Sequence, residues 1–169
     1  MEMKKAVYAG SFDPVTNGHL WMIERGVLLF DELVVAVGGN PNKTVTFSLE
    51  ERMEMLKGSV HHLSHVIIES FVDQFLVHYA HSVGAQYILR GMRNERDYEF
   101  EREMRHINSD LQPDIITIFL IPPRKMSEVS SSLVKGFIGT RGWKTVVRQY
   151  VPEAALRFLT LKYLEDSTV

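Results

Sequence analysis

The chain has no cysteine among its 169 residues. Without cysteine there is no disulfide framework, no thiolate nucleophile and no zinc site built from cysteine ligands. Catalysis by a thiolate and folding around Cys-ligated zinc are therefore both excluded.

Long apolar runs are also missing. No stretch of 18 apolar residues is present, and residues 1–5 lead directly into a short apolar segment without the hydrophobic region of a signal peptide. We therefore expect no membrane association and a cytoplasmic location.

An excess of positive charge is absent as well. The chain has 19 Lys and Arg against 21 Asp and Glu, a formal net charge of -2. No global basic field is available to bind nucleic acid by counterion release, so we expect no nucleic-acid partner. Any phosphate that the chain binds is expected to belong to a small molecule.

What the chain has is an alternation of strand and helix patterns. Five β-branched or apolar runs, each followed by a helical pattern, lie at residues 6–9, 32–38, 66–68, 87–89 and 115–121. This order predicts a single-domain, Rossmann-like α/β fold over residues 1–169, with a doubly wound sheet of five parallel strands, helices on both faces and a C-terminal helical tail from about residue 141.

Two helices have stripes that predict their buried faces. After the third strand, the expected core face comprises Phe75, Leu76, Tyr79, Ala80 and Val83. After the fourth strand it comprises Phe100, Met104, Ile107 and Leu111, beside a polar line of Asp97, Glu101, Arg105 and Asn108.

The stretch at residues 10–19, Gly-Ser-Phe-Asp-Pro-Val-Thr-Asn-Gly-His, links the first strand to the first helix. Unpaired N–H groups at a helix start attract anions, and Gly10 and Gly18 let a phosphate approach the backbone closely. No lysine follows Gly18, so this is not a P-loop, and it also lacks the GxGxxG spacing. His19 is predicted to lie on the first helical turn, facing the phosphate.

Three further segments follow strands or open helices. They are the loop with Lys43, the turn Arg90-Gly91-Met92-Arg93, and the serines at 130–132. Ligands of open α/β sheets bind at the carboxyl ends of the strands, so we expect these segments to meet the 10–19 stretch in one anion-binding crevice.

Each feature has an ordinary alternative. Lys43 could be a solvated loop residue, the two arginines could pair with Asp97 and Glu99 at the surface, and the serines could only cap a helix. His61, His62 and His65 lie close together, but no carboxylates stand at ligand spacing and we expect no metal site there. Lys125-Met126-Ser127 is similar to part of the KMSKS loop of class I synthetases.

Thr16-Asn17-Gly18-His19 resembles the T/HxGH signature of the nucleotidyltransferase superfamily. Together with YAGSFDPVTNGHL, NPNKTVTFSLEER, ILRGMRNERDYEFE and SEVSSSLVK, it makes nearly the whole chain similar to the bacterial phosphopantetheine adenylyltransferases. The resemblance implies transfer of AMP from ATP to 4'-phosphopantetheine, giving dephospho-CoA and pyrophosphate. It also implies a homohexamer, Mg²⁺ carried by the ATP phosphates, and CoA as a candidate feedback inhibitor.

The resemblance also implies roles for individual residues. His19 would stabilise the transition state, with Lys43, Arg93 and Ser11 as the other catalytic residues. The phosphopantetheine site would comprise Ser11, Lys43, Leu76, Arg90 and Asn108. The ATP site would comprise Ser11, Phe12, His19, Gly91, Met92, Arg93, Glu101, Met126, Ser127, Glu128, Val129, Ser130, Ser131 and Ser132.

The chain departs from the family pattern at three places. Ser11 stands where many members have threonine, and Met126 where some have tryptophan. One extra residue lies between Phe71 and Ala80, which leaves Phe75 as an alternative to Leu76. Rival functions are a nicotinate mononucleotide adenylyltransferase, a cytidylyltransferase for a small phosphorylated alcohol, and a nucleotide-binding module without catalysis.

Overall fold

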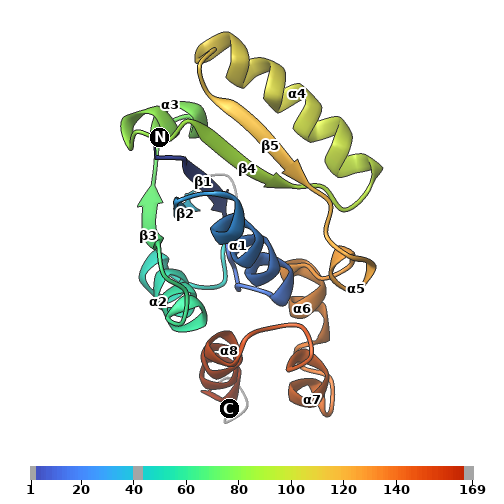
Figure 1. The fold of residues 1–169 in the computed structure, drawn as a ribbon. Coiled ribbons are helices and arrows are strands. Elements are labelled where there is room, and N and C mark those ends of the chain that lie inside the picture. Colours follow the sequence, from blue (N-terminus) through green and yellow to red (C-terminus); the bar gives the residue numbers. More distant parts are fainter. Residues whose placement is uncertain (1–2, 40–43, 166–169) are drawn as a thin grey trace.

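A five-stranded parallel sheet forms the centre of the computed structural model, which describes residues 3–39 and 44–165 (Figure 1). Its strand order is β3-β2-β1-β4-β5, and every neighbouring pair is parallel. The strands are β1 (Lys5–Gly10), β2 (Glu32–Gly38), β3 (Val66–Phe71), β4 (Tyr87–Gly91) and β5 (Ile116–Leu120). The predicted sheet is confirmed, including the full extent of β2.

Helices connect the strands and continue beyond the sheet. They are α1 (Asn17–Leu29), α2 (Leu49–Val60), α3 (Leu76–Ser82), α4 (Glu95–Leu111), α5 (Arg124–Ser127), α6 (Ser131–Phe137), α7 (Trp143–Val147) and α8 (Glu153–Glu165). In Figure 1, α6, α7 and α8 lie together below the sheet, and α8 packs beside α2. The fold does not test the predicted start of a C-terminal helical tail at about residue 141, which stays a prediction.

Alternate side chains of the strands point into two separate cores. Ala6 and Tyr8 of β1 belong to a core formed with α1, α2, α6, α7 and α8, whereas Val7 and Ala9 belong to a second core formed with α3. Because successive side chains of a strand point to opposite faces, a strand buried on both faces is apolar throughout. Helices therefore cover both faces of the sheet, as predicted.

The predicted core face of α4 is wrong. Phe100, Ile107 and Leu111 are 56, 45 and 39% exposed, whereas Glu101 and Asn108, on the predicted polar line, are buried. Glu101 turns inward because it forms an ion pair with Arg90 of β4. A buried charge needs a partner, so this pair determines which face of α4 points to the sheet.

The assignment of Phe75 to a core face is also wrong. Phe75 is the residue before α3 and is 58% exposed, while Val77, Tyr79 and Ala80 are buried. The helix therefore begins one residue later than the stripe predicted.

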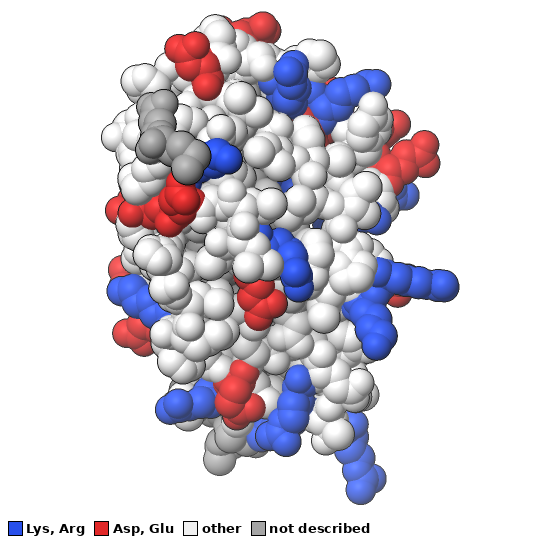
Figure 2. Space-filling view, in the orientation of Figure 1, with Lys and Arg blue, Asp and Glu red and all other residues white. Residues whose placement is uncertain are grey.

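The surface carries charges of both signs. On the face drawn in Figure 2, Lys and Arg side chains are interspersed with Asp and Glu side chains. Across residues 3–39 and 44–165, no helix combines the length and apolar character needed to span a bilayer.

A buried carboxylate holds the loop between β1 and α1. Asp13 is 1% exposed and accepts hydrogen bonds from the backbone N–H groups of Thr46 and Phe47, at 3.0 and 2.9 Å. Its Oδ2 also lies 2.8 Å from Nζ of Lys135 on α6. The Asp13 carboxylate thus joins three segments that are distant in sequence.

Arg52 of α2 supports the same loop from another side. Its side chain is buried, and Nη1 donates to the carbonyl oxygen of Ser11 at 2.8 Å and to that of Gly38 at 3.5 Å. The loop is therefore held by side chains from α2 and α6 as well as by its own backbone.

We predict that Asp13→Asn lowers the free energy of unfolding by about 2 kcal/mol at neutral pH, because it removes one partner of a largely buried ion pair. Burial raises the pKa of Asp13, but the hydrogen bonds from Lys135, Thr46 and Phe47 outweigh it and hold that pKa below its usual value. The pKa of Asp13 is lower in the folded protein than in the unfolded chain, where it is about 4. Its charge therefore stabilises the fold at pH values above about 4, and this stabilisation is lost as the pH falls through the pKa of the folded state.

Denaturant unfolding of both proteins at neutral pH and below pH 4 measures this difference. The difference in free energy of unfolding between wild type and Asp13→Asn should become smaller in acid. Asp110 is exposed, so Asp110→Asn should have the stability of the wild type at every pH. A gap that keeps its size at all pH values would show that the charge of Asp13 does not stabilise the fold.

Candidate functional site

A cavity of about 410 Å³ lies where β1 and β4 end. The chain passes from β1 through β2 and β3 and then returns to the other side of β1, so β1 and β4 flank the point at which the strand order reverses. Open α/β sheets bind ligands at this point. The starts of α1 and α6 border the same cavity through His19 and Ser131.

The first turn of α1 has a capping box that orients His19. Thr16 precedes the helix, its hydroxyl accepts the backbone N–H of His19, and Nδ1 of His19 accepts the backbone N–H of Thr16 at 3.0 Å. A backbone amide can only donate, so Nδ1 carries no proton and the neutral ring carries it on Nε2. His19 is thereby prepared to donate from Nε2.

Phe12 supports His19 from inside the protein. It is fully buried and its ring centroid lies 5.0 Å from that of His19, in an edge-to-face arrangement. Its φ of 48° lies in the left-handed region, and its ring lies close to Gly10. A Cβ on Gly10 would stand only 3.1 Å from this ring, so the close approach favours glycine.

The segment around α6 packs closely on the start of α1. A Cβ on Gly18 would lie 3.3 Å from the carbonyl oxygen of Val129. Ser130 caps α6 by accepting the N–H of Leu133, while the hydroxyl of Ser131 donates to the carbonyl oxygen of Pro14. Two helix starts, each capped by one side-chain hydrogen bond, therefore border one cavity.

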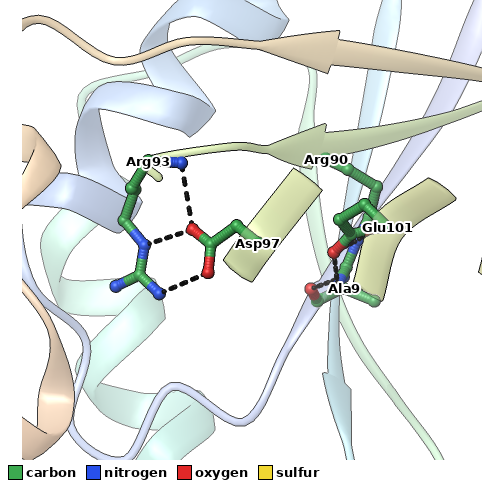
Figure 3. Close-up of polar contacts among 5 residues, drawn as sticks. All are labelled: Ala9, Arg90, Arg93, Asp97 and Glu101. Atoms are coloured by element: carbon green, nitrogen blue, oxygen red, sulfur yellow. Dashed lines mark hydrogen bonds and ion pairs between the residues drawn. The ribbon is translucent and has the colours of Figure 1, made fainter. Parts of the chain in front are cut away.

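Both predicted arginines line the cavity, and both are paired with carboxylates of α4 (Figure 3). Arg90 donates to Glu101 through Nε, at 2.9 Å, and through Nη2, and it also donates from Nη1 to the carbonyl oxygen of Ala9. Arg93 donates from Nε and Nη2 to Asp97, at 2.8 and 3.2 Å. The alternative pairing of the arginines is thus correct for Asp97, but Glu101 and not the exposed Glu99 pairs with Arg90.

The second pair affects the pKa of both partners. The hydrogen bonds that Arg93 donates to Asp97 raise the pKa of Arg93, so its guanidinium stays charged. Burial raises the pKa of Asp97, but the hydrogen bonds from Arg93 outweigh it and lower that pKa overall. Both groups are therefore ionised at neutral pH.

A second cavity, of about 610 Å³, adjoins the first and shares Ser11 and Arg90 with it. It lies beside the ends of β2 and β3, and Leu76 lines it. Phe75 does not line this cavity and is mostly exposed, so Leu76 is the one of the two that borders it.

Most of the predicted site residues meet at these two cavities. The main cavity is lined by Ser11, His19, Arg90, Gly91, Arg93, Glu101, Met126, Val129, Ser130, Ser131 and Ser132, and the second by Ser11, Leu76 and Arg90. Phe12, Met92, Asn108, Ser127 and Glu128 line neither cavity. Lys43 lies outside the described residues.

Sequence reasoning missed several residues of the site. Tyr8 and Met22 line the main cavity but look like ordinary core residues of a strand and a helix. Phe100 also lines both cavities, although its spacing placed it in the core. Burial raises the pKa of Tyr8, so its phenol remains protonated and uncharged beside the arginines.

The arrangement suits two anions and offers little for proton abstraction. Two helix starts, two arginines and an Nε2–H donor face the main cavity, and His19 is its only imidazole among the described lining residues. No group of three or more His, Asp or Glu side chains in the described part of the chain could hold a metal ion. Charge neutralisation and positioning are the chemistry that this site can supply.

Comparisons with known proteins agree with this chemistry. A family model described as cytidylyltransferase-like matches residues 7–137. The chain is 60% identical to the phosphopantetheine adenylyltransferase of Chromobacterium violaceum over 97% of this chain and 100% of the relative, and 53% identical to that of Neisseria meningitidis serogroup C over 97 and 96%.

Among solved structures, Plasmodium falciparum nicotinic acid mononucleotide adenylyltransferase complexed with NaAD has a TM-score of 0.69 at 15% identity and 96% coverage of both chains. At that identity the likeness concerns the fold alone. The family match and the high identity of the bacterial relatives carry the assignment. The chain therefore belongs to the cytidylyltransferase-like family and, within it, to the phosphopantetheine adenylyltransferases.

Proposed function

We propose that the chain transfers the adenylyl group of ATP to 4'-phosphopantetheine, giving dephospho-CoA and pyrophosphate in coenzyme A biosynthesis. One observation carries this proposal: a cavity with two arginines and two helix starts joins a second cavity bordered by Leu76, and the two meet at Ser11 and Arg90. The first suits the nucleotide and the second suits a long, partly apolar acceptor. Both substrates bring their phosphates to the shared wall.

The reaction needs no general base. The attacking oxygen belongs to a phosphomonoester, whose second pKa is about 6, so it is already anionic at neutral pH. The enzyme has to place this anion in line with the α-phosphate of ATP and stabilise the charge that develops on the phosphorus and on the leaving pyrophosphate. His19 supplies a neutral Nε2–H donor for that purpose.

The other roles follow the position of each group. Ser11, at the junction of the cavities, orients the phosphate of phosphopantetheine, and Arg90 lies on the acceptor side. Lys43, which lies outside the described residues, is given the same phosphate on the family resemblance alone. Arg93 and the N–H groups at the start of α6 bind the β and γ phosphates. Residues 126–132, with Gly91, enclose the rest of ATP.

Magnesium belongs to the substrate in this proposal. Among the described residues, the carboxylates that line the main cavity are Asp97 and Glu101, and both are bound to arginines, so neither is reserved for a cation. Mg²⁺ keeps several waters and binds readily to phosphate oxygens. Carried by the triphosphate, it reduces the negative charge that the arginines must balance.

We also propose a homo-oligomer, with six copies as the family suggests, in the cytoplasm where ATP is made and used. Large apolar side chains on α4 and at the ends of β5 support an interface, because Ile107, Leu111, Ile116 and Ile121 are 45, 39, 55 and 75% exposed. Light scattering that finds a monomer would contradict this.

CoA, which contains the phosphopantetheine group, remains a candidate inhibitor at the acceptor site.

Pyrophosphate release tests the proposed reaction. With ATP as donor, we expect turnover with 4'-phosphopantetheine and none above background with nicotinate mononucleotide, and no turnover with CTP and glycerol 3-phosphate. Turnover with either of the last two acceptors would favour another member of the superfamily. ATP binding without turnover on any acceptor would indicate a nucleotide-binding module.

His19→Ala and His19→Gln test the transition-state role. We expect His19→Ala to lower turnover about a hundredfold or more while ATP binding survives, which is the scale of losing one preorganised donor. His19→Gln keeps an amide N–H donor and should lose less turnover than the alanine variant. Glutamine at the third position of a helix completes a capping box as His19 does, so the glutamine variant should retain the thermal stability of the wild type. Near-normal turnover of His19→Ala would contradict the role.

A further inference from the structure

The formal charges around the main cavity are balanced. Among the described residues that line it, Arg90 and Arg93 carry positive charge, and Asp97 and Glu101 carry negative charge. The two carboxylates lie one turn apart on α4 and each faces one arginine (Figure 3). A phosphate that is to bind an arginine with full strength must therefore compete with a carboxylate.

The two pairs differ in how firmly they are held. The side chains of Arg90 and Glu101 are 25 and 8% exposed, and Arg90 has a further hydrogen bond to Ala9. The side chains of Arg93 and Asp97 are 37 and 21% exposed, and within the described chain the guanidinium contacts of Arg93 are to Asp97. The Arg93 pair is thus the one that a ligand can open at low cost.

Asp97 is anchored by backbone hydrogen bonds, whereas the guanidinium of Arg93 is held, among the described residues, by Asp97. The backbone N–H of Asp97 donates to the side chain of Asn94, and its Oδ2 accepts the backbone N–H of Arg93 at 2.9 Å. When the pair opens, the carboxylate stays in place and the arginine side chain moves. Asp97 holds the Nε and Nη2 edge of the guanidinium, which is the edge that binds two oxygens of a phosphate side by side.

We propose that Asp97 is a positioning residue that competes with the nucleotide's phosphates for Arg93. The carboxylate keeps Arg93 charged and beside the cavity, and it limits the affinity for ATP and for the pyrophosphate product. The inference rests on the proposed function, in which Arg93 binds the β and γ phosphates. It adds that the carboxylate of Asp97 weakens phosphate binding, so that the pyrophosphate product can leave.

Binding of inorganic pyrophosphate to the full chain, measured by calorimetry, tests the competition. Asparagine removes the charge of Asp97 but keeps an oxygen that can accept the backbone N–H of Arg93. We expect Asp97→Asn to lower the Kd about three- to fivefold, the upper range for a partly exposed ion pair. Asp97→Glu, which keeps the charge, should stay within about twofold of the wild type.

Two controls separate competition from a general charge effect. Glu99→Gln removes the same charge from an exposed position two residues away on α4, and should change the Kd much less. In an Arg93→Met background, Asp97→Asn should change the Kd no more than Glu99→Gln does, because the contested guanidinium is gone. A purely structural role of Asp97 would not produce a gain in affinity.

Weaker pyrophosphate binding by Asp97→Asn, or a change no larger than that of Glu99→Gln, would overturn the proposal and identify Asp97 as a fixed support for Arg93. Pyrophosphate binding with the expected pattern but no adenylyl transfer by the wild type would contradict the proposed function alone. Failure of the wild type to bind pyrophosphate would contradict both.

Discussion

The ion pair between Asp13 and Lys135 is the interaction on which the site depends most. It joins the loop after β1 to α6, and the same carboxylate holds the backbone at Thr46 and Phe47. These segments position the starts of α1 and α6, which both border the main cavity. If the loop were displaced, the hydrogen-bond donors of the two helix starts would no longer face the same ligand. The fold therefore keeps a buried charge in the loop that borders the main cavity, although Asp13 itself lines neither cavity.

A second layer of charge surrounds the first. The arginines of β4 and of the turn after it are matched by two carboxylates of α4, so the cavity is balanced although its ligands are strongly negative. This arrangement orients both arginines and keeps Arg93 ionised, and it moderates how tightly phosphate is retained. Affinity for a product that must leave is thereby limited by the enzyme's own carboxylate.

The sequence predicted the sheet because its strands are apolar on both faces, and it predicted the crevice because loops at the carboxyl ends of parallel strands must meet. It misjudged α4, since the burial of Glu101 depends on Arg90 of another strand and no local periodicity contains that information. The contacts of Asp13 with Lys135, Thr46 and Phe47 were missed for the same reason. Its partner Lys135 is 122 residues away, so only the folded chain brings the two together.

The central claim is that two anions are brought into line and no proton is removed in the chemical step. The solvent isotope effect on single-turnover adenylyl transfer tests it directly, with ATP and 4'-phosphopantetheine both saturating and the rate compared in H₂O and D₂O at pH values where the phosphate is fully ionised. The account predicts the same rate in both solvents. A clearly slower reaction in D₂O would show a proton in transfer and would contradict it.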